Sequence, residues 1–499
     1  AASDVYKRQP IQRENSADVI VVGSGIAGLS AAVTAAQAGA RVILLERAPR
    51  DDRGGNTRWT DAYLRMKSEQ EVADDFETHF MANAGHHLDP AIIQETTGDF
   101  ASRSALAKTV GMTDPDVIAT FAERAGATLQ WLKTFGLRFD FLPSYLITTC
   151  TPRLAPIGGG LAMVDALADW AEDNGIDVRY ETSARGLIHD EDGAVVGLIA
   201  AGKENRTTDL LAPAVILACG GFEGNPEMLV HYLGGQARYL RPVARGGYYN
   251  KGEGIRMALA AGAAPSGDYS RFHAEPLDPR SGAPEPIVLI FNYGVLINVA
   301  GERFVDEAPA TVDATYEAIT REIHAQPQSL AYAIFDAGID DVPNWQRCVR
   351  SDVPPFEADT LAGLAAQIDV DADTITRTIE DYNTACPTDA SAFKPLETDG
   401  LATAPGYTPR KSNWARRIAK PPFRAYPIMC GNCFTFGGLK VDPQARVLNT
   451  DGEAIPGLYA AGETMGIYYG TYTGATSVLR GAVFGRIAGE GAARQRTTS

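Results

Sequence analysis

The sequence has no run of 18 apolar residues, which is about the minimum for a helix that crosses a membrane. Residues 1–18 also lack the apolar segment of a secretory signal. Cysteine is scarce as well, because six cysteines among 499 residues are too few for a disulfide framework. Together these absences predict a cytoplasmic protein with no membrane span.

Positive charge is also in short supply. The chain has 45 lysines and arginines against 62 aspartates and glutamates, which gives a formal net charge of −17. Nucleic-acid binding needs a basic surface for phosphate contacts, so this balance argues against it and against adhesion to an anionic membrane. An anionic substrate is still compatible, since a few arginines in a pocket can reverse the local potential.

A glycine-rich turn near the start of the chain is the clearest signal that is present. Residues 18–22 (DVIVV) are typical of a buried parallel strand, and residues 26–38 carry alanine and leucine at helical spacing. Residues 42–46 (VILLE) form a second strand-like run, and the turn GSGIAG at residues 23–28 precedes the helix. This strand–helix–strand order predicts an α/β fold with a Rossmann-type unit.

Each glycine of the turn has a physical purpose. Gly23 permits the tight turn out of the strand, Gly25 lets the backbone approach a pyrophosphate, and Gly28 lets the helix pack closely on the sheet. The start of the helix offers unpaired N–H groups to the phosphates. Glu46 ends the second strand, about 20 residues further on, where a carboxylate accepts hydrogen bonds from ribose hydroxyls. The turn therefore predicts a dinucleotide site.

Two distant segments favour FAD over NAD. Residues 53–57 (RGGNT) follow the second strand, where glycines let the chain pass close to a ring system and Asn56 and Thr57 offer hydrogen bonds. Near the other end, residues 457–463 (GLYAAGE) resemble the first sheet again, and residues 474–477 precede a helix. A helix N-terminus directed at the flavin would stabilise its reduced anion.

The middle of the chain has a different pattern. Strand-like runs at residues 287–290 and 295–299 mix with helical runs at 315–324 and 374–386. This mixture predicts an α+β cap, or substrate, domain that interrupts the Rossmann-type FAD-binding domain. The predicted parts are residues 17–244 for the first part of the FAD-binding domain, 245–407 for the cap and 408–492 for the second part.

These motifs resemble the fumarate reductase/succinate dehydrogenase flavoprotein superfamily. The matching segments are GSGIAGLSAA, ERAPRDDRGGNT, VILACGGFEGNPEM, NKGEGIRMALAAGA, GERFVDE and GLYAAGET with AVFGRIAG. The resemblance implies FAD under a closing cap, and oxidation or reduction of a C–C bond beside a carboxylate or carbonyl. The residues predicted to bind FAD are Gly23, Gly25, Ile26, Ala27, Gly28, Glu46, Arg47, Gly54, Gly55, Asn56, Thr57, Ala184, Cys219, Gly220, Gly221, Gly462, Glu463, Ser477, Val478 and Leu479.

Within the superfamily the chain is most similar to tricarballylate dehydrogenases, through ERAPRDDRGGNTRWT, RGGYYNKGEG, DATYEAITREIHAQP, and SNWA with PPFRAYP. Thr57 stands in the neighbourhood where membrane-bound members attach flavin through histidine, so we expect non-covalent FAD. Three dicarboxylate-binding groups of soluble fumarate reductases have no counterpart, which makes plain fumarate reduction unexpected. The neighbourhood of their catalytic arginine contains Thr311, Val312 or Tyr316 here. That of a substrate histidine contains Phe434, and that of a late substrate arginine contains Tyr472 or Thr473.

Desaturation beside a carboxylate or carbonyl requires a base, a hydride acceptor and a group that holds the developing negative charge. Arg245 and Arg321 are the candidates for charge stabilisation, since arginine can grip a carboxylate with two parallel hydrogen bonds. Tyr316, Tyr472 and His273 are the candidates for proton transfer. The CxxC at residues 430–433 has no partner motif for zinc and is interpreted as incidental, so no metal site is predicted.

Three functions are compatible with these features. The first is an FAD-dependent dehydrogenase that introduces, or reduces, a C=C bond in a tricarballylate-type polycarboxylate and passes electrons to a separate acceptor. The second is the same chemistry on a ketosteroid-type or other enone, which the aromatic cluster Tyr468, Tyr469 and Tyr472 would suit. The third is a non-enzymatic flavin electron-relay subunit of a larger complex.

Overall fold

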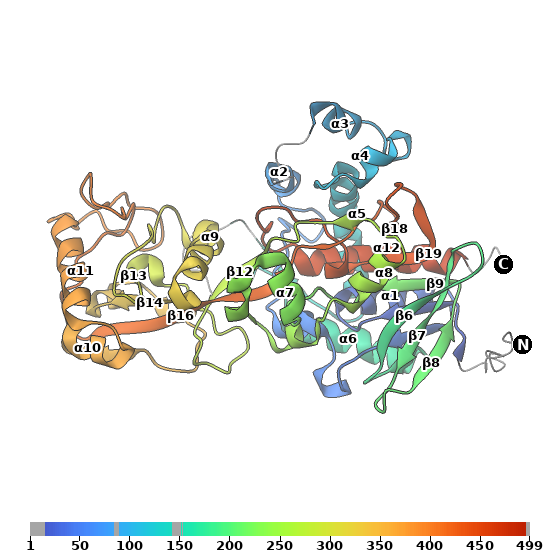
Figure 1. Cartoon of the computed structure of the whole chain (residues 1–499), viewed down its shortest axis with the longest axis horizontal. Coiled ribbons are helices and arrows are strands. Elements are labelled where there is room, and N and C mark those ends of the chain that lie inside the picture. The colour runs from blue at the N-terminus through green and yellow to red at the C-terminus, as the bar shows by residue number, and fades with distance from the viewer. Residues whose placement is uncertain (1–14, 84–88, 142–150, 152, 496–499) are drawn as a thin grey trace, which may run out of the picture.

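The computed structural model describes residues 15–83, 89–141, 151 and 153–495, and these residues form two lobes joined at a narrow waist (Figure 1). The larger lobe contains the chain segments near both termini. The smaller lobe, hereafter the cap, contains the helices α9, α10 and α11 and the strands β13 and β14. Strand β16 runs from the cap toward the larger lobe, so the two lobes share an element.

The larger lobe is built on a six-stranded sheet in the order β18-β19-β9-β1-β2-β5. Its strands pair in parallel except for β18, which is antiparallel to β19. The central strand β1 is buried throughout, because both faces of the sheet are covered. The strands are β1 (Val19–Val22), β2 (Val42–Leu45), β5 (Asp177–Arg179), β9 (Ala214–Leu217), β18 (Arg446–Leu448) and β19 (Ala454–Ala460).

Helices and smaller sheets surround this sheet. Three strands form the sheet β6-β7-β8, and two pairs form the ribbons β3-β4 and β11-β17. The strands are β3 (Phe139–Asp140), β4 (Ala155–Pro156), β6 (Ser183–His189), β7 (Val195–Ala201), β8 (Thr207–Leu211), β11 (Pro265–Ser266) and β17 (Gly438–Leu439). The helices are α1 (Ile26–Gln37), α2 (Phe76–Ala82), α3 (Pro90–Glu95), α4 (Ala105–Thr109), α5 (Pro115–Lys133), α6 (Gly159–Asp173), α7 (Pro226–Leu233), α8 (Glu253–Ala260) and α12 (Ser477–Gln495).

The cap is built on a second sheet in the order β10-β16-β14-β13, with β12 and β15 also paired to β16. The long strand β16 is therefore the centre of this sheet. The strands are β10 (Arg241–Pro242), β12 (Phe272–Leu277), β13 (Val295–Asn298), β14 (Leu330–Phe335), β15 (Phe356–Ala358) and β16 (Phe423–Thr435). The helices are α9 (Val312–Ala325), α10 (Leu361–Ile368) and α11 (Ala372–Ala385).

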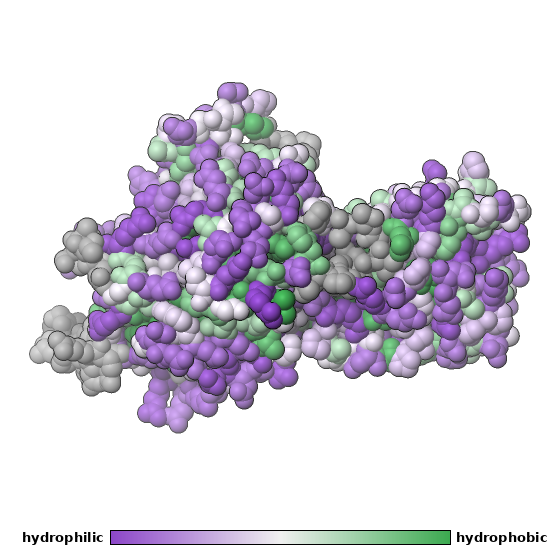
Figure 2. All heavy atoms as spheres, turned by 180° about the vertical axis from the view of Figure 1, so that it is seen from behind, coloured by the Kyte–Doolittle hydropathy of each residue, from purple (hydrophilic) through white to green (hydrophobic). Residues whose placement is uncertain are grey.

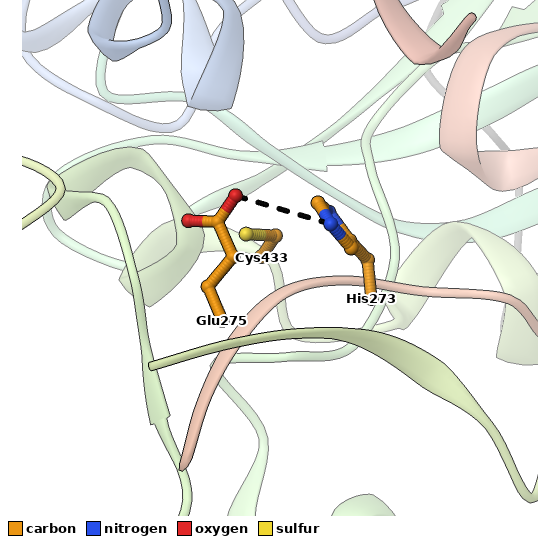
Figure 3. A group of neighbouring side chains, drawn as sticks. All are labelled: His273, Glu275 and Cys433. Carbon is orange, nitrogen blue, oxygen red and sulfur yellow. Dashed lines mark ion pairs between the residues drawn. The ribbon is translucent and has the colours of Figure 1, made fainter. Parts of the chain in front are cut away.

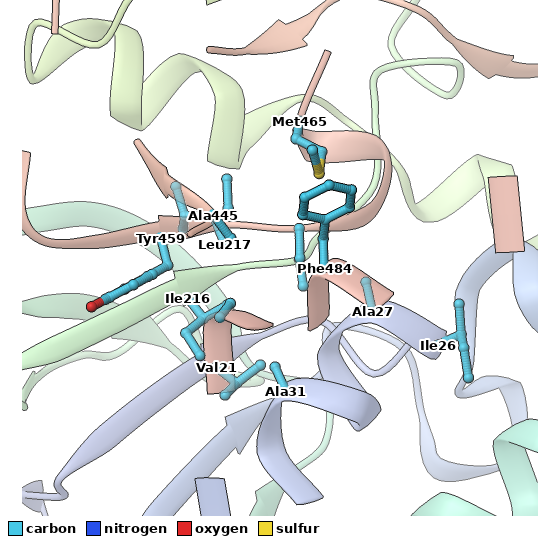
Figure 4. Packing of buried hydrophobic residues seen from close by; sticks show 14 of the residues in the cluster. Val21, Ile26, Ala27, Ala31, Ile216, Leu217, Ala445, Tyr459, Met465 and Phe484 are labelled. Carbon is cyan, nitrogen blue, oxygen red and sulfur yellow. The ribbon is translucent and has the colours of Figure 1, made fainter. Parts of the chain in front are cut away.

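The two ends of the chain meet where helices α1 and α12 pack against each other (Figure 4). Three glycines spaced four residues apart on α12 make this contact possible. A Cβ on Gly485 would lie 2.3 Å from the Ala27 carbonyl oxygen, and one on Gly489 would lie 2.4 Å from that of Ala31. A Cβ on Gly481 would lie 2.7 Å from the Ile26 side chain. The absence of side chains on this stripe brings the helix backbones together.

The sequence predicted the α/β class correctly, and most of the expected elements are present. The run 287–290 is not a strand, because only isolated bridges form at Ile287 and Val288. The cap boundary at residue 407 also needs correction. Strand β16, which that boundary would assign to the FAD-binding domain, pairs with β12, β14 and β15 of the cap. The chain leaves the cap sheet only after Thr435.

Hydrophilic side chains cover most of the face seen in Figure 2, and the larger hydrophobic groups there lie near the waist between the lobes. Within the described ranges, no helix has both the length and the apolar character needed to traverse a bilayer.

The glycine stripe gives a direct stability prediction. Gly485→Ala would place a methyl group against backbone that cannot move away, so we expect a loss of about 1–3 kcal/mol in the free energy of unfolding. Gly491→Ala on the same helix is the control, because its methyl would meet the Tyr459 ring edge at 3.0 Å, where a side chain can adjust. Urea unfolding monitored by circular dichroism measures both. Equal stability of the two variants would contradict the close contact.

Candidate active site

One large cavity runs between the first sheet and the cap. It contains about 1740 Å³ of empty space, part of it open to solvent. One part is lined by the glycine turn, the end of β2 and the start of α12. Another part is lined by residues of β12, β16 and α9. Segments that are far apart in sequence therefore face a single space.

The first part of the cavity fits a dinucleotide. A Cβ on Gly28 would lie 1.7 Å from the Gly23 carbonyl oxygen, so this position requires glycine for packing. A Cβ on Gly25 would have no protein neighbour nearer than 3.6 Å, so the open space beside it belongs to the cavity. The Glu46 carboxylate is held by the Ser24 N–H at 2.9 Å and the Ala48 N–H at 2.7 Å. It lines the cavity as a fixed acceptor for ribose hydroxyls.

The loop after β2 forms another wall of the cavity. The Ile26 N–H donates to the Thr57 hydroxyl oxygen at 3.2 Å, which ties this loop to the start of α1. Asn56 donates from its side-chain nitrogen to Glu223 at 2.6 Å and to the Cys433 carbonyl at 3.0 Å. Its buried Oδ1 accepts no hydrogen bond from the described residues. A buried acceptor beside an open cavity is what a hydrogen-bonding cofactor would satisfy.

Two buried carboxyl groups meet beside this loop. Asn250 donates to Glu223 at 2.6 Å, and the Thr435 N–H donates to Glu463 at 2.8 Å. Burial and the neighbouring Glu463 carboxyl raise the pKa of Glu223 well above its ordinary value, and burial also raises the pKa of Glu463. Glu463 disfavours ionisation of Glu223, whereas the hydrogen bond from Glu223 favours ionisation of Glu463, so Glu223 is the member of the pair that keeps its proton.

Sixteen of the predicted FAD residues line the cavity and four lie behind it. Gly28, Gly54, Gly221 and Leu479 do not line it. A Cβ on Gly221 would lie 2.0 Å from the Glu463 carboxylate, so this glycine makes room for a lining residue. The lining residues are Gly23, Gly25, Ile26, Ala27, Glu46, Arg47, Gly55, Asn56, Thr57, Ala184, Cys219, Gly220, Gly462, Glu463, Ser477 and Val478.

The three candidates for proton transfer all line the second part of the cavity. The Tyr316 hydroxyl lies 2.7 Å from Nε2 of His273, and the rings of His273 and Tyr472 are 4.5 Å apart. Burial, with the positive charges of Arg321 and Arg153, lowers the pKa of His273 to about 3. The imidazole is therefore neutral at physiological pH. It can fix the Tyr316 hydroxyl by a hydrogen bond, in an orientation that depends on its tautomer.

Tyr472 has a different environment from Tyr316. Its hydroxyl accepts the N–H groups of Thr476 and Ser477, each at 3.0 Å, and donates to the Ser477 hydroxyl at 3.0 Å. These N–H groups belong to the start of α12, so the hydroxyl satisfies the helix end. Tyr472 lines the cavity, and its hydroxyl is already occupied by hydrogen bonds to the start of α12.

Neither predicted arginine lines the cavity. The Arg245 side chain is 66% exposed and lies 3.4 Å from Asp52 at the surface. Arg321 is held by Glu317 at 2.5 Å and by the Phe272 carbonyl oxygen. Arg153, which the sequence did not reveal, lines the cavity, and its positive charge acts on His273. It is paired with Asp313 of α9 at 2.8 Å.

Two further acids and a thiol complete this part of the cavity. Glu275 and Glu285 line it, and burial raises their pKa values to about 7 and about 8. Figure 3 shows the Glu275 carboxylate turned toward His273, at 3.9 Å from Nε2, with Cys433 beside them. Glu275 follows His273 by two positions in a strand, and alternate residues of a strand lie on the same face. The sequence could therefore have predicted that Glu275 lies on the same side as His273. Glu285 had no such signal.

The two cysteines of the CxxC motif, Cys430 and Cys433, lie in different environments. Cys433 lines the cavity, whereas Cys430 packs with Phe272 and Ala274 in a small hydrophobic cluster. Residues three apart on a strand face opposite sides, so the two thiols do not act as a pair.

Comparisons with known proteins agree with this geometry. The model of the FAD binding domain family matches residues 18–479. The chain belongs to this family. It is 26% identical to the vinyl phenol reductase of Lactiplantibacillus plantarum over 93% of this chain and 92% of that protein. It is 27% identical to the fumarate reductase (cytochrome) of Shewanella frigidimarina over 96% and 77% of the two chains.

A solved structure shows the same fold over the whole chain. The 3-ketosteroid Δ4-(5α)-dehydrogenase of Rhodococcus jostii superposes with a TM-score of 0.65 at 25% identity, covering 97% of this chain and 98% of that one. These findings confirm the superfamily, the FAD cofactor and an FAD-dependent oxidoreductase, which excludes the electron-relay hypothesis. The narrower resemblance to tricarballylate dehydrogenases stays a prediction.

Gly25 allows a sharp test of the cofactor site. Gly25→Ala adds a methyl group that meets no protein atom within 3.6 Å but enters the space for the pyrophosphate. We expect FAD affinity to fall at least about tenfold, or about 1.4 kcal/mol, with an unchanged fold. Titration of the apoprotein with FAD, followed by flavin fluorescence, measures this. Gly202→Ala, with open space at its Cβ, is the control, and unchanged affinity in Gly25→Ala would contradict the site.

Proposed function

We propose that the enzyme transfers hydrogen to or from the C–C bond next to the carbonyl of a ring ketone or enone. The observation that carries this proposal is the Tyr316–His273 pair in the part of the cavity that faces the cap. A tyrosine hydroxyl fixed by a neutral imidazole can exchange a proton with a carbon beside a carbonyl. The resemblance to a ketosteroid dehydrogenase structure supports the same substrate class.

The charges of the cavity disfavour the polycarboxylate alternative. Tricarballylate would bring three carboxylates, and Arg245 and Arg321 both lie outside the cavity. Of the three arginines that line the cavity among the described residues, Arg47 is paired with Glu253 and Arg153 with Asp313, while Arg480 is buried against the rings of Phe434 and Tyr468. Glu275 and Glu285 would add repulsion wherever they are ionised. A substrate with a neutral carbonyl avoids this cost.

The residues divide the chemistry among them. When bound, FAD supplies the hydride donor or acceptor for the carbon next to the one that exchanges its proton. Tyr316 gives a proton to the carbon next to the carbonyl in reduction, or removes a proton from it in desaturation. His273 orients the Tyr316 hydroxyl. Arg153, which lies beside Gly474 and stays paired with Asp313, donates a hydrogen bond to the carbonyl oxygen as negative charge develops there.

Three further expectations belong to this proposal. The cofactor is held without a covalent bond, which the Thr57 hydroxyl in its hydrogen bond to Ile26 supports. Electrons pass to or from a separate partner. The segment between residue 245 and the end of β16 acts as the substrate-binding cap over the flavin.

An anaerobic flavin-bleaching panel tests the substrate class. We expect saturated ring ketones such as 3-ketosteroids or cyclohexanones to bleach the oxidised flavin, or the matching enones to reoxidise the reduced flavin. Tricarballylate should do neither, because Glu275 and Glu285 line the cap side of the cavity and Arg153 on that side is paired with Asp313. Stopped-flow absorbance at the flavin band measures both directions. Bleaching by tricarballylate with no response to ketones or enones would reverse the assignment.

Tyr316→Phe tests the proton-transfer group. Loss of the hydroxyl should lower kcat by about 10²–10⁴-fold, the usual contribution of a positioned acid or base, while FAD content stays the same. Tyr293→Phe is the matched control, since its hydroxyl donates to the Pro395 carbonyl within the cap. Full activity in Tyr316→Phe would show that another group transfers the proton.

A further inference from the structure

The acids on the cap side of the cavity outnumber the cations available to them. Arg350 lies 2.9 Å from Glu285 and 2.9 Å from Asp61, so one guanidinium serves two carboxylates. Glu275 forms no ion pair with a lysine or arginine of the described residues. Nε2 of His273 lies 3.9 Å from its carboxylate. Because His273 is neutral, this contact supplies no positive charge.

Glu275 is the least satisfied of these acids. It is only 8% exposed, and it lines the cavity. Among the described residues, its one hydrogen-bonding neighbour is the thiol of Cys433, a weak donor. A buried carboxyl group that lines a cavity and has one weak hydrogen-bond donor is typical of a group that binds a ligand.

We propose that Glu275 and Glu285 form a subsite for a cationic nitrogen carried by the substrate, next to the Tyr316–His273 pair. The position of the carbonyl end rests on the proposed function, which places it between Tyr316 and Arg153. Glu275 lies 3.9 Å from Nε2 of His273, the atom that contacts the Tyr316 hydroxyl, and Glu285 lines the same cavity. A protonated amine there supplies the positive charge that Glu275 lacks, and it adds to the one that Arg350 shares between Glu285 and Asp61.

A metal ion fits this cluster less well than an organic cation. Nε2 of His273, a Glu275 oxygen and the Cys433 sulfur lie within 4.8 Å of one another, which makes them a candidate donor set. Zinc bonds of about 2.0–2.3 Å would draw these atoms closer together than that spread. The same His273 nitrogen already lies 2.7 Å from the Tyr316 hydroxyl. The observed spacing suits hydrogen bonds to a larger cation.

The subsite gives binding a defined pH dependence. The pKa values of Glu275 and Glu285 are raised to about 7 and about 8, so both acids lose their protons as the pH rises through this range. A cation should therefore bind more tightly at pH 8.5 than at pH 6, whereas a neutral ligand should show no such gain. The charged and titratable groups around them are His273, Cys433, Glu317, Arg350 and Asp61.

Three ligands of one shape test the subsite on the oxidised holoenzyme. Cyclohexylamine, cyclohexanol and cyclohexanecarboxylate lack a ketone, so their binding does not depend on turnover or on the proposed reaction. Isothermal titration calorimetry should show cyclohexylamine binding at least tenfold more tightly than the carboxylate, and more tightly at pH 8.5 than at pH 6. Tighter binding of the carboxylate, or equal binding of all three, overturns the proposal.

Variants assign the effect to the two acids. Glu275→Gln and Glu285→Gln should each reduce cyclohexylamine affinity about tenfold and leave cyclohexanol affinity unchanged. Glu397→Gln, an exposed cap acid paired with Lys394, is the control and should change neither. A zinc titration of the same proteins tests whether the cluster binds a metal ion instead of an amine. Tight zinc binding that is lost in both Glu275→Gln and Cys433→Ser would make the cluster a metal site and overturn the amine assignment.

Discussion

The close contact between α1 and α12 is the constraint on which the rest of the site depends. The stripe of Gly481, Gly485 and Gly489 lets the two helix backbones touch, so the last helix of the chain packs against the first. This contact brings the start of α12 beside the turn at Gly25, where both line the cavity. Both ends of the chain therefore line the space proposed for FAD, and part of the segment between them builds the cap.

Electrostatics then separates the two parts of the cavity. The nucleotide part presents a helix start, backbone N–H groups and the fixed carboxylate of Glu46. The cap part presents buried acids and a neutral His273, with Arg153 tied to Asp313. This contrast is compatible with an anionic cofactor in one part of the cavity and with the neutral ring ketone or enone proposed for the other. It also explains why a net charge of −17 is compatible with a pyrophosphate site.

The nucleotide part was predictable because its signals are local in sequence. A strand, a glycine turn and a helix need no distant contact to be recognised, and Glu46 follows at a fixed interval. The cap part was less predictable, since β12, β16 and α9 converge only through tertiary structure. Arg245 and Arg321 were plausible by residue type, but one lies at the surface and the other is held by Glu317. Arg153 and Glu285 enter the site from loops whose sequences carry no periodic signal.

The central claim is that the flavin and the Tyr316–His273 pair share one cavity. A crystal structure with FAD and a saturated ring ketone tests this claim most directly. The account predicts the flavin ring against the Asn56 loop, with the ketone between that ring and Tyr316. Its α-carbon should lie within hydrogen-transfer distance of the Tyr316 hydroxyl. A ketone bound elsewhere, or a flavin ring that leaves Tyr316 and His273 out of reach of the substrate, would contradict the account.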